Sequence, residues 1–467
     1  MHAAGHHRLG FSERLGYGLG DTASNFYFQT FNIFLLYYYT DVFGISAAAV
    51  GTMFFVSRLW DAINDPLMGA LSDRTRSRWG RYRPFLLWMA IPYGLMGYLM
   101  FANPELDGTG RLLYAWVTYT LMMMFYTAIN VPYSALMGVM SPSSRERTTL
   151  ASFRFVGAFG GALLISMMVR PMVQYFGAED EAAGFRVTMA IFAVASILMF
   201  WVTFALTRER VVAPPKERVS LRNDFRILLS MGPWLVLFVA GILTLASVAL
   251  RTSVTIHYFK YYVLDDGSAF FWFLDQTTFF LTINALFLIV GVCCTRFLTD
   301  RFEKVTLLIW LSALSAVFTS LLFFVPPDQF GTMLIISAIA SLLAGPTAPL
   351  VWAMYGDVAD YGEWRFKRRM NGLICSACMF AQKFGLTIGA GLSGWLLAYF
   401  GFIANVPQTD EALLGIRLLF TFIPASFAVL NVMVLLFYTL SDKHVGRIEE
   451  SLRRRKLKQA SPLASTA

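Results

Sequence analysis

The sequence predicts an all-α membrane protein with twelve transmembrane helices in two six-helix bundles. Three observations predict this class: the composition, the number of long apolar runs, and the alternation of charge between the loops. Of the 467 residues, 57% are hydrophobic and only 14% are charged, whereas soluble proteins carry about 25% charged residues. This composition excludes a water-soluble fold.

The apolar runs supply the predicted helices in chain order. A helix needs about 20 apolar residues to cross the hydrocarbon core of a bilayer, so a chain of this length has room for about twelve spans. The runs lie at residues 15–40, 47–72, 84–102, 111–140, 150–176, 185–206, 227–263, 268–295, 305–326, 331–358, 372–401 and 413–440.

The loops between these runs alternate in charge. Basic residues cluster at 74–83, 145–147, 208–226, 296–304 and 365–369, and acidic residues at 105–107, 179–181, 265–266 and 410–411. Because basic loops remain in the cytoplasm, we expect a multi-pass protein of the plasma (inner) membrane with both termini cytoplasmic. The net charge of +9 therefore reflects orientation in the bilayer, and no nucleic-acid partner is expected.

A long polar stretch divides the spans six and six. It covers residues 207–226, with Pro214, Pro215 and Lys216 at its centre, and such a stretch is typical of a linker. We expect a first bundle at 1–206, a cytoplasmic linker at 207–226, a second bundle at 227–440 and a cytoplasmic tail at 441–467. The tetrapeptide LSDR at 71–74 returns as LTDR at 298–301, a weak duplication of the kind found in transporters built from repeated halves.

The four cysteines indicate neither a disulfide framework nor a metal site. Cys293, Cys294, Cys375 and Cys378 all lie in or at the ends of apolar runs. The last two form a CxxC pair, but no histidine or second pair lies nearby, so we expect packing residues in a helix. Residues 1–14 are polar and run directly into the first span, so no cleavable signal peptide is expected.

Charged residues inside the spans are the functional candidates, because each costs at least ~2.5 kcal/mol to insert. Asp61 and Asp65 lie four residues apart in the second span, on one helix face, with Arg58 and Asn64 near that face. Two close carboxylates in a poorly solvated site must share a proton or hold a cation between them. Alternatively, they form salt bridges with Arg58 and Lys383 that only hold helices together.

Two further sets of side chains join this candidate site. Thr127, in the fourth span, could add a hydroxyl oxygen, and oxygen ligands suit a hard ion such as Na⁺; alternatively, its hydroxyl bonds its own helix backbone.

A sugar site could be formed by Asp21 in the first span and Arg154 in the fifth, with Tyr27 and other aromatic residues close in sequence. The alternative is an ion pair without a ligand. His257 is expected to be a packing residue rather than a proton relay.

Ordered motifs across both halves are similar to those of the glycoside-pentoside-hexuronide:cation symporters, the melibiose permease group of the major facilitator superfamily. The resemblance covers residues 10–440 and implies the major facilitator fold. The motifs that carry it are DTASN at 21–25, YYYTD at 37–41, RLWDAINDP at 58–66, GALSDR at 69–74, RWGRYRP at 78–84, NVPY at 130–133, RER at 145–147 and DYGE at 360–363.

The resemblance also implies site residues. It places the cation site, with Na⁺ at the two carboxylates, on Asp61, Asn64, Asp65 and Thr127, and the solute site on Asp21, Tyr27, Asn130 and Arg154, with Lys383 linking the sites. Melibiose permease itself has a second Asp where this chain has Asn130 and a Trp where it has Ser134. A galactoside preference is therefore not implied, and Asn130 resembles members that carry xylosides, glucuronides or other glycosides.

These residues predict a secondary active transporter that couples inward movement of Na⁺ or H⁺ to uptake of a sugar or glycoside by alternating access. Lys383 and Arg58 would hold the vacant carboxylates and couple the two sites. A cytoplasmic gate is expected from Asp73, Arg74, Arg81, Asp357 and Asp360. No enzymatic activity and no cofactor beyond the coupling ion are expected. The expected partners are the solute, a monovalent cation and the bilayer, and the protein is expected to be a monomer.

Three alternatives remain open from the sequence. Relatives with the same cation-site pattern carry lysolipids, which need a cavity that opens to the bilayer. Two acidic motifs, at 61–65 and 357–360, could bind Mg²⁺-diphosphates in an intramembrane prenyl transferase, although such enzymes have about nine spans and do not require Lys383. A sensor without transport activity would need a sizeable soluble domain, which the chain lacks. Neither the solute nor the choice among Na⁺, H⁺ and Li⁺ follows from the sequence.

Overall fold

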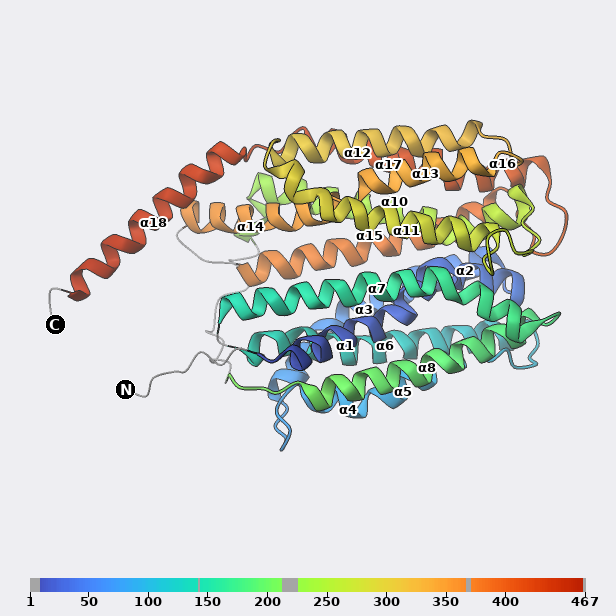
Figure 1. The fold of residues 1–467 in the computed structure, drawn as a ribbon, viewed down its shortest axis with the longest axis horizontal. Coiled ribbons are helices and arrows are strands. Elements are labelled where there is room, and N and C mark those ends of the chain that lie inside the picture. Colours follow the sequence, from blue (N-terminus) through green and yellow to red (C-terminus); the bar gives the residue numbers. More distant parts are fainter. Residues whose placement is uncertain (1–8, 142, 212–225, 367–370, 465–467) are drawn as a thin grey trace. The chain divides into compact units, whose positions relative to one another are not determined.

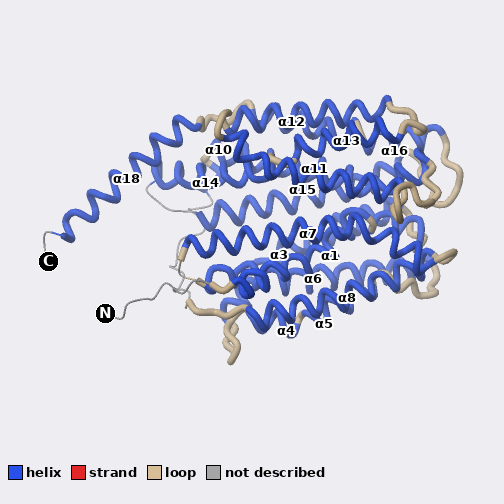
Figure 2. The backbone as a smooth tube through the Cα atoms, viewed as in Figure 1, coloured by secondary structure: helices blue, strands red, loops and turns tan. Residues whose placement is uncertain are grey.

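The structure is a computed structural model that describes residues 9–141, 143–211, 226–366 and 371–464. Within these ranges the regular elements are helices, apart from two isolated β-bridges, Ser77 with Gly80 and Phe271 with Leu274. Figure 2 shows this predominance of helix along the whole described backbone. The predicted all-α class is therefore confirmed.

Helices occupy all six spans predicted for the first half. The first span is one nearly continuous rod of α1, α2 and the π-helical segment η1, and the third is divided between α4 and α5. The bounds are α1 (Phe11–Ile33), α2 (Leu35–Tyr37), η1 (Tyr38–Val42), α3 (Ala47–Arg74), α4 (Arg83–Trp88), α5 (Ala90–Leu99), α6 (Gly108–Met140), α7 (Ser144–Gly177) and α8 (Glu181–Leu206).

Helices also occupy the six spans predicted for the second half. The seventh span again ends in a π-helical segment, η2. The bounds are α10 (Gly232–His257), η2 (Tyr258–Val263), α11 (Gln276–Thr299), α12 (Lys304–Leu321), the 3₁₀ segment η3 (Leu322–Phe324), α13 (Phe330–Ala344), α14 (Thr347–Phe366), α15 (Asn371–Tyr399), α16 (Asp410–Phe420) and α17 (Phe422–Leu435), followed by α18 (Asp442–Ala464) in the tail.

Eight helical stretches among the described residues are long and apolar enough to cross a membrane. They are α6, most of α7, α8, α10 with η2, α11, α12 with η3, α13 with α14, and α16 with α17. The other four predicted spans fall on α1 to η1, α3, α4 with α5, and α15. Of these, α1, α3 and α15 carry the charged residues Asp21, Asp61 and Lys383, which lower their apolar character.

The predicted start of the eighth span, at residue 268, is wrong. The helix α11 begins at Gln276, and the Asp275 carboxylate accepts a hydrogen bond from the Thr278 backbone N–H at 2.8 Å, as a helix N-cap does. The residues before it include Phe271 and Trp272, both exposed. Aromatic side chains at the end of a span lengthen an apolar run without extending its helix, so Asp275 precedes α11 instead of lying inside it.

The described chain forms two compact units. The first comprises the described residues within 1–216, 252–285 and 390–417, and the second comprises the described residues within 217–251, 286–389 and 418–467. Within the first unit, α1 packs against α7 and α8, and α3 packs against α6, as Figure 1 shows. Within the second unit, α12 packs against α13 and α17. The predicted bundles at 1–206 and 227–440 remain a prediction, and residues 212–225 of the predicted linker lie outside the described ranges.

Candidate functional site

A close approach of two helices holds two of the predicted solute residues together. On α1 and α7, a Cβ atom added at Gly157 would overlap the carbonyl oxygen of Gly18. The Thr22 hydroxyl donates to the Gly157 carbonyl at 3.0 Å. Small residues permit such close packing between membrane helices. Asp21 and Arg154 each lie three residues from one of these glycines, and therefore one helical turn from the contact.

Asp21 and Arg154 form an ion pair across this contact. The Arg154 Nε atom lies 3.3 Å from the Asp21 Oδ1 atom, with side chains 29% and 11% exposed. The guanidinium also lies 5.2 Å from the centre of the Tyr133 ring, which stacks on Tyr17 at 4.7 Å. A carboxylate, a guanidinium and aromatic faces thus lie together, as sugar recognition requires, but the pair is also satisfied without a ligand.

Asn130 lies where α6 meets α1. The Ser24 hydroxyl donates to the Asn130 side-chain oxygen at 2.9 Å, and the Asn130 amide donates to the Tyr126 carbonyl at 3.0 Å. The Tyr126 ring stacks on Phe28 with 6.1 Å between centroids. Helices α1 and α6 therefore add the Asn130 amide and the rings of Phe28 and Tyr126 to the candidate solute residues.

Tyr27 is not brought together with these residues. Its side chain is fully buried, its hydroxyl donates to the Met189 carbonyl of α8 at 3.2 Å, and its ring packs on Tyr93 of α5 at 5.4 Å. A Cβ atom at Gly97 would overlap the Tyr27 ring. Tyr27 therefore fills the space between α1, α5 and α8, and its position does not favour solute contact.

The predicted cation residues meet between α3 and α6. The Thr127 hydroxyl donates to the Asp65 Oδ1 atom at 3.0 Å, so this hydroxyl reaches a carboxylate. Asp61 lies one turn earlier on α3 and is only 3% exposed; Asn64 is half-buried on the same helix. Two carboxylates, an amide and a hydroxyl therefore lie within about one turn of the same helix contact.

The two predicted coupling residues lie in different compact units. Arg58 is buried on α3, donates from Nε to the Tyr119 hydroxyl at 3.3 Å and is within electrostatic reach of Asp61. Its position suits a group that compensates the carboxylate charge. Lys383 lies on α15 in the second unit, and its contact with the carboxylates stays a prediction.

Tyr126 was not among the predicted site residues. This side chain is near Asp21 and Arg154, and also near Arg58 and Asp61. It therefore lies between the candidate solute residues and the candidate cation residues. The available signal was its spacing, because Tyr126 directly precedes Thr127 and stands one helical turn before Asn130.

Three of the predicted gate residues lie at the end of α3 or in the basic loop after it: Asp73, Arg74 and Arg81. The Asp73 carboxylate accepts from the Tyr82 hydroxyl at 2.8 Å, and Arg74 is the last residue of α3. Burial and, next, the hydrogen bond to Asp73 raise the pKa of Tyr82 to about 12. Tyr82 therefore remains a hydrogen-bond donor to Asp73 throughout the neutral pH range.

Glu209 organises this loop and was not predicted. Its carboxylate accepts backbone hydrogen bonds from Arg81, at 2.9 Å, and from the next two residues, at 2.8 and 3.0 Å. Gly80 has a φ of +110°, and a Cβ atom there would overlap Glu209, so a glycine is required at this turn. Glu209 lies between Arg208 and Arg210 in sequence, which concealed its role.

The other predicted gate residues lie in the second unit. The Asp357 carboxylate forms an ion pair with Lys304 at 2.5 Å, and Lys304 also lies 3.3 Å from Asp442. Asp360 lies three residues later on α14. Lys304 belongs to a basic cluster noted in the sequence but was not predicted as the partner of Asp357. A gate that joins the two sets of residues remains a prediction.

Comparisons with known proteins agree with the arrangement of these helices. Residues 16–442 match the family described as MFS/sugar transport protein. The chain is 36% identical to the putative glycoside/cation symporter YagG of Escherichia coli (strain K12), over 98% of this chain and 99% of the relative. It is 36% identical to the inner membrane symporter YicJ of the same organism, over 96% of both chains. It is 32% identical to an isoprimeverose transporter of Lactiplantibacillus pentosus, over 91% of this chain and 88% of the relative.

Two solved structures share the fold. A crystal structure of the nucleoside transporter NupG matches with a TM-score of 0.64 at 14% identity, over 91% of this chain and all of that one. A D-xylose-proton symporter matches with a TM-score of 0.61 at 15% identity, over 92% and 97%. The helices therefore have the major facilitator fold that the sequence motifs predicted.

Proposed function

The chain belongs to the MFS/sugar transport protein family, and from that premise we propose that it imports a sugar or glycoside together with Na⁺ or H⁺. The predicted resemblance to the glycoside-pentoside-hexuronide:cation symporters is confirmed by the family match and by relatives named as glycoside/cation symporter and isoprimeverose transporter. A multi-pass membrane transporter is thereby established. The coupling ion and the solute belong to the proposal.

The contact of Thr127 with Asp65 carries the proposal. It is a 3.0 Å hydrogen bond between two helices, next to a second carboxylate, Asp61, that is almost fully buried. Two carboxylates one helical turn apart, one of them buried and the other partly buried, cannot both stay ionised without compensation. A monovalent cation among the oxygens of Asp61, Asn64, Asp65 and Thr127 would supply it, and this oxygen-rich set favours Na⁺.

The solute would bind at Asp21, Asn130 and Arg154. The ion pair between Asp21 and Arg154 offers both an acceptor and a donor to sugar hydroxyls, and Asn130 offers an amide. The rings of Phe28 and Tyr126, stacked beside these residues, suit the apolar faces of a sugar ring. Tyr27, buried against α5 and α8, is better explained as a packing residue.

Coupling would arise because the vacant carboxylates need Arg58 and Lys383 as counter-charges. A bound cation would neutralise them, release those partners and favour a cavity in which Asp21 and Arg154 engage the solute. One positive charge moving inward across 100 mV releases ~2.3 kcal/mol, enough for roughly fiftyfold accumulation.

The cytoplasmic side would close in one state of the cycle through salt bridges among the gate residues Asp73, Arg74, Arg81, Asp357 and Asp360.

The remaining features follow from the same proposal. We expect both termini in the cytoplasm because of the charge of the loops, a monomer as the working unit, and no cofactor besides the coupling ion. Membership of a transporter family favours transport over catalysis, so we expect no enzymatic activity, including no prenyl transfer.

Counterflow in membrane vesicles tests the proposal. Vesicles preloaded with one glycoside of a panel should exchange it for labelled glycoside, and Na⁺ should accelerate the exchange if it is the coupling ion. An Asp61→Asn variant should lose cation-driven accumulation. Exchange of lysophospholipids but of no glycoside would replace the sugar by a lipid as the solute, and full accumulation by Asp61→Asn would remove the cation role of this residue.

A further inference from the structure

A second buried ionic cluster lies far from the candidate solute residues, at the C-terminal end of the rod formed by α1, α2 and η1. Its centre is Asp41 of η1, whose side chain is fully buried. Asp41 stands 20 residues after Asp21 on a nearly continuous helical rod, so the two are about 30 Å apart at 1.5 Å per residue. The acidic loops at 179–181 and 265–266 lie at this end, where their residues line a cavity together with Tyr37 and Lys260, and we expect this end to face outward.

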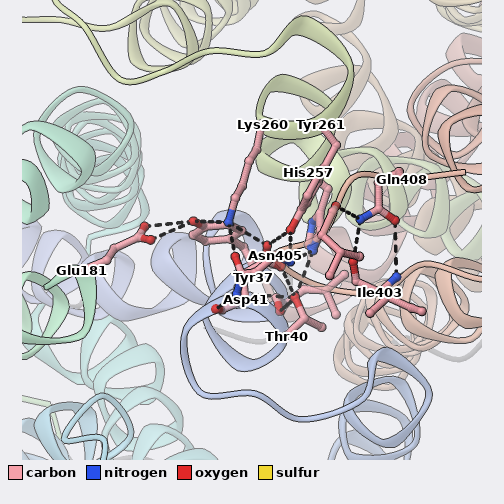
Figure 3. A network of polar contacts seen from close by, with 12 residues as sticks. Tyr37, Thr40, Asp41, Glu181, His257, Lys260, Tyr261, Ile403, Asn405 and Gln408 are labelled. Carbon is pink, nitrogen blue, oxygen red and sulfur yellow. Dashed lines mark hydrogen bonds and ion pairs between the residues drawn. The ribbon is translucent and has the colours of Figure 1, made fainter. Parts of the chain in front are cut away.

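The Asp41 carboxylate is held mainly from elements of the second half of the chain. Lys260 of η2 donates to Oδ1 at 2.9 Å, and the Tyr261 hydroxyl also donates to Oδ1. His257, the last residue of α10, places its Nε2 atom 3.4 Å from Oδ2. Asn405, in the loop between α15 and α16, donates to the Asp41 backbone carbonyl at 2.6 Å. Figure 3 shows these side chains converging on Asp41.

The partners are also bonded to one another. Lys260 donates to the Asn405 side-chain oxygen at 2.8 Å, and the Asn405 backbone N–H donates to the Tyr261 hydroxyl at 2.8 Å. All of them lie in the first compact unit. The cluster therefore joins η1 of the first half with η2 and with the loop after α15 in a single network.

Both π-helical segments contribute to the network. η1 supplies Asp41, and η2 supplies Lys260 and Tyr261. Each segment ends the first long helix of its half, so they occupy equivalent positions in the two halves. Such segments are rare and occur often at functional sites, and their repetition at these two positions favours a role in the transport cycle over an accident of packing.

The buried charge of Asp41 makes the cluster depend on partners from the second half of the chain. A fully desolvated carboxylate must be paired, and both basic partners of Asp41 belong to the second half. If η1 and η2 separated, water would have to replace Lys260 and His257. Lys260 is 29% exposed and lines a cavity of about 310 Å³ together with Tyr37, Arg170 and Glu181, so water can reach the network from its edge.

We propose that Asp41, His257, Lys260, Tyr261 and Asn405 form an outer latch, which closes the outer entrance while these residues are bonded and must open before a solute enters from outside. The direction of solute entry rests on the proposed import function. A neighbouring ion pair, Arg170 with Asp275 at 2.6 Å, also links the two halves at this end, so the latch shares the closure with a second contact.

Thiol labelling measures the opening directly. In a chain whose four native cysteines are replaced by serine, Ser253→Cys provides a reporter on α10. Ser253 is only 3% exposed and lies one turn inward from His257 on the same helix face. A membrane-impermeant maleimide added outside intact cells should label this cysteine slowly while the latch is closed.

Asp41→Asn and Lys260→Gln should each accelerate labelling at least tenfold, because removing one partner of a buried ion pair strongly destabilises the bonded arrangement. The double variant should label no faster than the faster single variant, because both changes remove the same contact. Lys260→Arg should remain close to the parent. Arg111→Gln is the matched control, because Arg111 donates hydrogen bonds to the carbonyls of Leu106 and Phe43, which both belong to its own half.

The latch would be overturned if Asp41→Asn and Lys260→Gln were both labelled at the rate of the parent. This conclusion requires that both variants have a thermal stability in detergent near that of the parent. Equal acceleration by Arg111→Gln would also overturn the latch. If Asp41→Asn does not fold, the partly exposed Lys260→Gln and Asn405→Ala decide the question. The reporter needs no solute, so accelerated labelling without any glycoside transport would reject the proposed function and leave the latch standing.

Discussion

The hydroxyl of Thr127 distinguishes a cation site from a simple pair of carboxylates. Thr127→Val removes the 3.0 Å hydrogen bond to Asp65 while preserving the shape of the side chain. Loss of a bond to a charged group costs about 1.5–3 kcal/mol, so we expect cation affinity to fall at least tenfold. Titration calorimetry of the purified protein with NaCl measures this change.

The control for this change is Thr118→Val on the same helix, because the Thr118 hydroxyl bonds the Tyr114 carbonyl of α6. Thr118→Val should leave cation affinity within about twofold of the parent. If both variants bind the cation as tightly as the parent, Thr127 is not part of the site.

Asp21 should act on the solute and not directly on the cation. Asp21→Asn removes the charge that faces Arg154 at 3.3 Å, so we expect solute affinity to fall at least tenfold, while cation affinity measured without solute stays within about threefold. Glu146→Gln, which breaks another ion pair between α1 and α7, that of Glu146 with Arg14 at 2.9 Å, should spare solute affinity. Binding of labelled solute to membranes measures both, and unchanged affinity in Asp21→Asn would argue for an ion pair without a ligand.

The sequence indicated some residues of the candidate site by type and position, but it could not place others. Charged residues in apolar runs identified Asp21, Asp61, Asp65 and Arg154, because insertion cost makes such residues exceptional. The same reasoning could not place Tyr27, since an aromatic residue fits both a solute site and a helix contact. Glu209 escaped prediction because its partners are backbone N–H groups, which leave no pattern in side-chain identity.

At the scale of helices, the close contact of α1 with α7 should determine the geometry of the solute residues. Gly157→Ala introduces a methyl group against the Gly18 carbonyl, and such overpacking costs about 1–3 kcal/mol. We expect a melting temperature several degrees lower and weaker solute binding, because Arg154 lies one turn away. Thermal unfolding in detergent, monitored by tryptophan fluorescence, measures the first effect.

The matched control for Gly157 lies on the same helix. Nothing lies close to the position of a Cβ atom at Gly160, and alanine is favoured over glycine in a helix by about 0.5–1 kcal/mol. Gly160→Ala should therefore be neutral or stabilising. Equal destabilisation by the two changes would mean that the contact with α1 does not decide the effect.

Helices were predicted best where a continuous apolar run has polar or capping residues at its ends. Ser46 and Asp107 accept hydrogen bonds from the first turns of α3 and α6, and both helices begin close to the predicted positions. The eighth span failed because Phe271 and Trp272 prolong the apolar run beyond the cap at Asp275. The π-helical ends η1 and η2 were not predicted, because hydropathy and apolar periodicity do not distinguish a π-helical turn from an α-helical one.

For the molecule as a whole, the proposal requires that solute and cation strengthen each other's binding equally. If the cation raises solute affinity about tenfold, the solute must raise cation affinity by the same factor. Calorimetric titrations of each ligand, with and without saturating amounts of the other, measure the two factors. Independent binding, with both factors near one, would reject a coupling in which Arg58 and Lys383 compensate the vacant carboxylates.

The all-α class and the family could be predicted at this scale, because composition and motif order are properties of the whole chain. The outer network could not: Asp41, His257 and Asn405 stand far apart in sequence, and only the fold brings them to one place. For the same reason His257 was expected to be a packing residue, although its ring nitrogen lies beside a carboxylate.

Solute accumulation in proteoliposomes tests the central claim most directly. With an inward cation gradient or a potential of 100 mV, negative inside, the account predicts accumulation above the external concentration, up to roughly fiftyfold for one charge per solute, and none by Asp61→Asn. Dissipating every inward ion gradient and the potential should reduce the internal solute to the external concentration. Accumulation that persists at the same level after this dissipation would contradict the account.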